Sequence, residues 1–183
     1  KSDPKEASRD FFYSLSKAQI SSAEIEYFGD STPTNIINAK YIYKIFPEAK
    51  FINMIRDGRD VALSVSQERW GPATPEKALL WWEKRIVHAH NSLTQLPQNS
   101  RHEIRLEQLV IHQREESYRA LLAFLGLDDH PNMRRYFDEQ MLVEKMHSGE
   151  WQQQVKNPEK FGSTYQKILK RLRKKDISIE KLY

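Results

Sequence analysis

The 183-residue sequence contains no cysteine, which excludes disulfide bonds, thiolate metal ligands and cysteine nucleophiles. It has no apolar run of the roughly 18 residues that a membrane-spanning helix needs, and residues 1–12 are too polar for a signal peptide. Internal repeats are absent, and 6 Gly and 8 Pro are too few for a linker-rich chain. We therefore expect one domain over residues 1–183, without stable membrane insertion, in a reducing compartment such as the cytoplasm.

The charge balance limits the kind of partner. Lysine and arginine number 29 against 25 acidic residues, a net charge of +4, and this excess is too small to indicate nucleic acid. It is compatible with a small anionic ligand. Several basic residues gather in residues 164–175, which we interpret as an amphipathic helix packed on the domain. Oligomeric state cannot be read from the sequence.

The first half of the chain reads as strand, helix, strand. Residues 23–28 suit a short strand, and apolar positions at helical spacing predict a helix over 36–46, capped by Asn35 and ended by Pro47. Residues 51–55 are mostly apolar, as in a strand covered on both faces of a parallel sheet. This order predicts a βαβ unit and an α/β domain.

The second half adds further helices and one more strand. A long helix is expected from Pro75 to Leu96, a short strand over 102–106, and a helix that Gly126 terminates. The alternation of strands and helices favours a parallel sheet flanked by helices.

The turn after residue 55 is the strongest candidate for a site. Ligands of such sheets bind outside the carboxyl ends of the strands, where a helix N-terminus favours anions. Arg56, at the strand end, can fork onto a phosphate, and the Ser64 hydroxyl near the first turns of the following helix can donate to the same group. The alternative is that the Arg-Asp pairs of this turn only cap the helix and form surface ion pairs.

Residues 46–64, FPEAKFINMIRDGRDVALS, resemble the 3′-phosphate-binding segment of sulfotransferases that use 3′-phosphoadenosine 5′-phosphosulfate (PAPS). Other segments follow in the order of that family. They are Gly29–Pro33, similar to its G-[DE]-K-[ST]-P loop, Trp70–Pro72, Arg105–Leu109, similar to its R-Y-E-D-L segment, 123–127 and, more weakly, 149–151.

The resemblance implies a P-loop-like sulfotransferase fold and transfer of a sulfuryl group from PAPS to an acceptor hydroxyl or amine, releasing adenosine 3′,5′-bisphosphate (PAP). The acceptor would be a small molecule or a glycan. Arg56 and Ser64 would hold the 3′-phosphate, while Thr32 and Pro33 would lie near the sulfuryl group or the acceptor. Trp151 would line the site, or alternatively anchor a loop in the core.

Three departures from the family limit this reading. Nothing in residues 1–24 resembles its 5′-phosphosulfate loop, so we expect the N-terminal strand and phosphate loop of the fold to be missing from residues 1–183. Ser31 stands where the family has lysine, and Leu106 where it has tyrosine. Two alternatives therefore stay open: a relative that binds PAP without catalysis, and a P-loop nucleotide kinase, although the chain has no Walker-type Gly-Lys-Ser/Thr sequence.

The general base is not identified by sequence. Asp30 is the candidate within the chain, and the alternative is an aspartate that caps a turn. No metal site is predicted, because His88 and His90 stand two apart on a helix and face different directions. His147 precedes a loop that is a candidate to approach the nucleotide.

Overall fold

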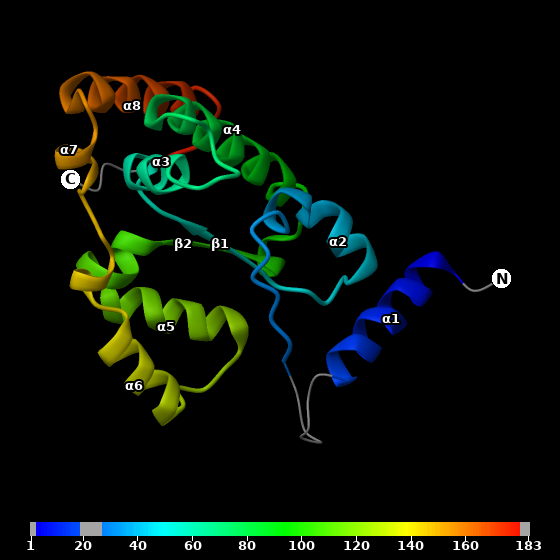
Figure 1. Ribbon diagram of the computed structural model, residues 1–183. Helices are drawn as coiled ribbons and strands as arrows, with labels where there is room; N and C mark the ends of the chain where they lie inside the picture. The colour runs from blue at the N-terminus through cyan, green and yellow to red at the C-terminus, as the bar shows by residue number, and fades with distance from the viewer. Residues whose placement is uncertain (1–2, 19–26, 180–183) are drawn as a thin grey trace.

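The computed structural model of the chain describes residues 3–18 and 27–179. In this part, two parallel strands lie between two groups of helices (Figure 1). The strands are β1 (Phe51–Ile55) and β2 (Arg101–Arg105). The α-helices are α1 (Pro4–Ala18), α2 (Ala39–Ile45), α3 (Gly58–Ser66), α4 (Pro75–Leu93), α5 (Arg114–Leu125), α6 (Pro131–Gln140), α7 (Trp151–Gln154) and α8 (Pro158–Arg173). Short 3₁₀ turns cover Ile36–Asn38, Gln98–Ser100 and Val143–Lys145, and a π-helical turn covers Gln108–His112.

The sheet confirms the predicted parallel architecture. β1 pairs in parallel with β2, from Phe51 opposite Arg101 to Ile55 opposite Arg105, and α3 and α4 form the crossover between them. The strand predicted over 23–28 falls largely outside the described residues, and Tyr27 and Phe28 have no regular secondary structure. Because both strands run the same way, their carboxyl ends meet at one edge of the sheet.

The expectation that residues 51–55 are covered on both faces is wrong. Burial alternates along β1, with Ile52 39% and Met54 48% exposed. The reason is the position of α5, which packs beneath β2 and joins Ile104 to Tyr118 and Leu122 in one apolar cluster. On that face α5 covers β2 and leaves the described part of β1 open.

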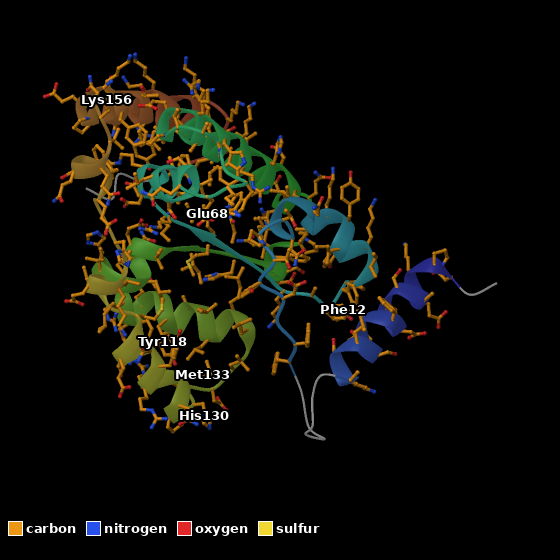
Figure 2. All side chains as sticks on the ribbon, in the orientation of Figure 1. Phe12, Glu68, Tyr118, His130, Met133 and Lys156 are labelled. Atoms are coloured by element: carbon orange, nitrogen blue, oxygen red, sulfur yellow. The ribbon has the colours of Figure 1, made fainter. Side chains whose placement is uncertain are left out.

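The opposite face of the sheet is covered by α3 and α4, with α8 on their outer side (Figure 1). The apolar side of α8 is fully used, because Phe161, Tyr165, Ile168, Leu169 and Leu172 are buried in the same cluster as Trp82 of α4. Its basic side chains point outward (Figure 2). The packed amphipathic helix is therefore confirmed, and it starts before Thr164 because the Asn157 side chain accepts the Lys160 N–H and caps it.

Of two other predicted helix ends, one is confirmed and one is wrong. Gly126 adopts a left-handed φ of 74° and ends α5, as predicted. The predicted Asn35 cap is wrong, since Asn35 has helical φ and ψ and makes no side-chain capping bond. A 3₁₀ turn over Ile36–Asn38 leads into α2 instead.

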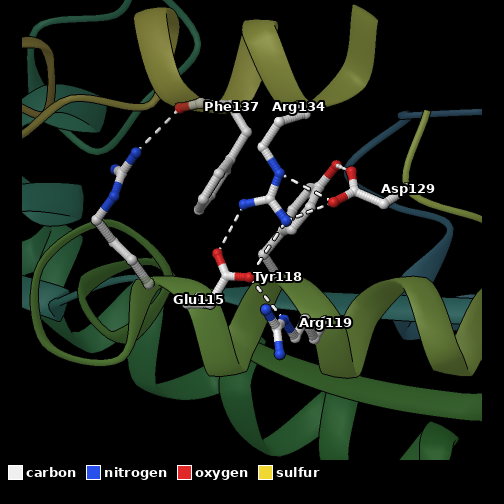
Figure 3. A network of polar contacts seen from close by, with 7 residues as sticks. Glu115, Tyr118, Arg119, Asp129, Arg134 and Phe137 are labelled. Atoms are coloured by element: carbon white, nitrogen blue, oxygen red, sulfur yellow. Dashed lines mark hydrogen bonds and ion pairs between the residues drawn. The ribbon is translucent and has the colours of Figure 1, made fainter. Parts of the chain in front are cut away.

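An arginine-centred network fixes α6 to α5 (Figure 3). Arg134 binds Glu115 at 2.6 Å and Asp129 at 2.5 Å, while the Tyr118 hydroxyl donates to Asp129 at 2.7 Å. The Tyr118 ring stacks on Phe137 at 4.4 Å between centroids. Each surface ion pair contributes little alone, so the stacked rings and the shared partners together hold this helix pair.

Among the described residues, no helix is both long and apolar enough to cross a membrane.

The turn between α3 and α4 requires glycine at residue 71. A Cβ there would lie 1.8 Å from the backbone oxygen of Val65, whereas a Cβ at Gly29 would meet nothing within 4 Å. We expect Gly71→Ala to lower the free energy of unfolding by at least about 2 kcal/mol, since a backbone oxygen can move only if the turn moves. Urea unfolding measures the change, with Gly29→Ala as the matched control. Equal stabilities of the two variants would contradict this account.

Candidate functional site

Arg56 lies at the carboxyl end of β1 and reaches a loop far away in sequence. Its Nη2 donates to the backbone oxygens of Met146 at 2.6 Å and His147 at 3.0 Å. Its Nε is buried and has no hydrogen-bond partner among the described residues. The guanidinium is thus oriented by the loop and retains donor capacity.

The N-terminus of α3 begins directly after Arg56. Asp57 is the N-cap, and its carboxylate accepts from the Arg59 backbone N–H at 2.8 Å and pairs with the Arg59 guanidinium at 2.6 Å. That guanidinium also lies over the rings of Trp151 and Tyr165, 4.5 and 4.8 Å from their centroids. The Arg-Asp pair at Asp57 and Arg59 thus caps the helix and forms an ion pair, as the alternative for this turn expected.

Asp60, in the first turn of α3, holds the loop from the other side. Its Oδ1 accepts the Gly149 N–H at 3.0 Å, and its Oδ2 is buried without a partner in the described structure. Burial, followed by the charge of Asp57, raises the pKa of Asp60 to about 6. The loop turns there through the left-handed backbones of His147 (φ 49°) and Gly149 (φ 80°). It lies beside Arg56, where sequence reasoning expected a loop near the nucleotide.

Glu107 joins the ends of the two strands. It is fully buried, at 0% exposure, and its Oε1 accepts the Asp57 backbone N–H at 2.7 Å. Burial raises the pKa of this carboxyl. Sequence reasoning noted Glu107 only within the R-L-E-Q-L segment and gave it no role. An acidic residue directly after the strand expected over 102–106 was the available signal.

Ser64 is exposed in the second turn of α3, and its hydroxyl makes no hydrogen bond within the described part of the chain. Arg56 and Ser64 therefore belong to the same strand-to-helix unit, as predicted. That both bind a phosphate stays a prediction.

The loop of Asp30, Thr32 and Pro33 is exposed. The Asp30 carboxylate accepts the Thr32 N–H at 2.8 Å, and hydrogen bonding from Thr32 lowers the pKa of Asp30. The Pro33 oxygen accepts from Arg85 at 3.1 Å. Asp30 thus caps a turn, the alternative considered for it, and a lowered pKa makes it a weaker base. Roles of these residues toward base catalysis or acceptor remain predictions.

Trp151 is 7% exposed and lies in the core, 5.9 Å from the Phe161 ring between centroids. This is the core anchoring weighed against a role in lining the site. Contact between Trp151 and a ligand stays a prediction, whereas its contact with Arg59 ties the loop to α3.

The described residues contain no group of three histidine or carboxylate side chains arranged to hold a metal ion.

The sulfotransferase resemblance is confirmed by comparison with known proteins. A family model described as "Sulfotransferase family" matches residues 3–131. The chain therefore belongs to the sulfotransferase family.

The chain is also similar to one curated protein and to one solved structure. Protein-tyrosine sulfotransferase 2 of chicken, Gallus gallus, is 27% identical over 106 residues, which cover 55% of this chain and 28% of that protein. Among solved structures, a sulfotransferase domain from the curacin biosynthetic pathway matches with a TM-score of 0.59 and 18% identity, over 89% of this chain and 67% of that one. This second likeness supports the fold, while the first spans less than a third of its relative.

The raised pKa of Asp60 makes one prediction about stability. Unfolded Asp60 loses its proton near 3.8 and folded Asp60 near 6, so its contribution to folding is favourable at low pH and is lost as pH rises between these values. Asp60→Asn does not titrate and keeps an oxygen for the Gly149 N–H. Its stability relative to the unmodified protein should rise by about 2 kcal/mol from about pH 4.5 to about pH 7.

Denaturant unfolding at several pH values measures this difference. Asp30→Asn is the control, because the pKa of exposed Asp30 is lowered and its contribution should stay constant over the same range. A pH-independent difference for Asp60→Asn would contradict the prediction.

Proposed function

We propose that this protein transfers a sulfuryl group from PAPS to an acceptor hydroxyl or amine and releases PAP. Arg56 and Ser64 bind the 3′-phosphate of the donor. The observation that carries the proposal is the partly exposed Arg56 side chain at the carboxyl end of β1, directly before the N-cap of α3, with its guanidinium held in place by two backbone oxygens. Membership of the sulfotransferase family supports the donor, since PAPS is the usual one for that family.

The chemistry of the site suits a phosphate monoester. A guanidinium donates charge-assisted hydrogen bonds to phosphate oxygens, and a serine hydroxyl on the following helix adds a neutral donor. Neither group reacts. Their contribution is to fix one end of the nucleotide, and transfer of a sulfuryl group in line with the acceptor depends on such alignment.

The acceptor is the less defined half of the proposal. The name of the chicken relative indicates protein tyrosine, and the solved domain belongs to curacin biosynthesis. Both names indicate transfer of a sulfuryl group, but they do not indicate the same acceptor. We keep a hydroxyl or amine of a small molecule or glycan as the acceptor and add a phenolic hydroxyl.

Binding of PAP against 5′-AMP tests the donor site directly, because the two differ in the 3′-phosphate. We expect tighter binding of PAP, a loss of about 10- to 100-fold in PAP affinity in Arg56→Ala, and a smaller loss in Ser64→Ala. AMP affinity should change little. Isothermal titration calorimetry on the longest natural chain that contains these residues provides the measurement.

Arg119→Ala is the matched control, since Arg119 is exposed on α5 and pairs only with Glu115 among the described residues. Equal affinity for PAP and AMP in the folded protein would overturn the proposal. PAP-specific binding without turnover of PAPS on any hydroxyl or amine acceptor would favour the alternative of a nucleotide-binding relative, which the substitutions at Ser31 and Leu106 suggest.

A further inference from the structure

We propose that Glu107 is a positioning residue of the 3′-phosphate site. It holds the backbone of Arg56 through the N–H of Asp57, and thereby sets the preference for a 3′-phosphate without touching the nucleotide. The inference rests on the proposed function.

The topology places Glu107 where it can act on Arg56. Ile55 and Arg105 form the last register pair of the sheet, and beyond them each strand turns into a helical segment. The bond from the Asp57 N–H to Glu107 Oε1, at 2.7 Å, extends the contact between the chains past that last pair. Arg56 lies between the two connections, so its backbone is fixed on both sides.

The side chain of Asp57 is held as well as its backbone N–H. While its N–H donates to Glu107, its carboxylate caps α3 and pairs with Arg59. The guanidinium of Arg56 is in turn held by the oxygens of Met146 and His147. Glu107 fixes the backbone of this arginine and the loop fixes its side chain, so losing either leaves the donor atoms less well placed.

Burial of the Glu107 carboxyl group costs free energy, which a role in positioning the Asp57 N–H would explain. Its Oε2 is buried without a hydrogen-bond partner in the described residues, and desolvation of a carboxyl costs free energy that one hydrogen bond does not recover. An apolar side chain of similar size would avoid this cost. A buried polar group that is not fully satisfied calls for an explanation, and fixing the Asp57 N–H supplies one.

The test compares variants that keep or remove the acceptor. Glu107→Gln retains an oxygen that can accept the Asp57 N–H, whereas Glu107→Leu removes it at similar volume. We expect Glu107→Leu to reduce PAP affinity about tenfold with AMP affinity nearly unchanged, and Glu107→Gln to keep the PAP/AMP ratio within about threefold of the original. A purely structural role would lower thermal stability without changing this ratio.

Glu103→Leu is the matched control. Glu103 stands on β2, two residues before Arg105, with an exposed side chain, and makes no contact with Asp57. Its PAP/AMP ratio should stay that of the unmodified protein. Circular dichroism and thermal unfolding without ligand establish that each variant is folded.

Several outcomes would overturn the proposal. A folded Glu107→Leu with an unchanged PAP/AMP ratio would do so, as would a Glu107→Gln that loses the ratio as fully as the leucine variant. If Glu107→Leu does not fold, Glu107→Asp replaces it, because the shorter side chain withdraws the acceptor; an unchanged ratio there is equally decisive. If the unmodified protein itself does not prefer PAP, both this inference and the proposed function fail. If the unmodified protein prefers PAP and Glu107→Leu keeps that preference in full, this inference alone fails.

Discussion

The parallel pairing of β1 with β2 determines where the polar side chains of the site lie. Parallel strands deliver their carboxyl ends to one edge, and the residues that follow each strand must then share that edge. Arg56 and Asp57 arrive there from β1, and Glu107 arrives from β2. An antiparallel pair would have separated them by the length of a strand. The loop at 146–149 contacts Arg56 and Asp60 near the same edge.

The site also buries several acidic side chains close together. Asp57, Asp60 and Glu107 are all buried close to Arg56 and Arg59, so acids outnumber the two arginines. Burial of several like charges is tolerated only where each is hydrogen-bonded or its pKa is raised. Asp57 pairs with Arg59, while Asp60 and Glu107 each accept a backbone N–H and also have a raised pKa. Because a raised pKa favours the protonated form of Asp60 and of Glu107, an anionic ligand would meet less negative charge there than three carboxyl groups with ordinary pKa values would carry.

Local signals in the sequence were sufficient for the strand at residues 51–55, the long helix after Pro75, the glycine stop at 126 and the sulfotransferase family. Contacts between distant segments were not predictable. The exposure of Ile52 and Met54 depends on where α5 packs, and the bond of Glu107 depends on strand register. Asn35 failed as a cap because a 3₁₀ turn forms there, a choice that short-range propensity does not determine. The sequence placed Arg56 and Ser64 in one strand-to-helix unit, while the orientation of the Arg56 side chain depends on the loop at 146–149.

The apolar interior of the described residues is divided into separate clusters. The cluster beneath the sheet joins β2, α5 and α6, and the cluster above it contains Ile55, α3, α4 and α8. Substitutions more than about 7–10 Å apart that share no partners act almost independently. Substitutions on the exposed outer surface of α6 should therefore leave the strand ends, and with them the surroundings of Arg56, almost unchanged.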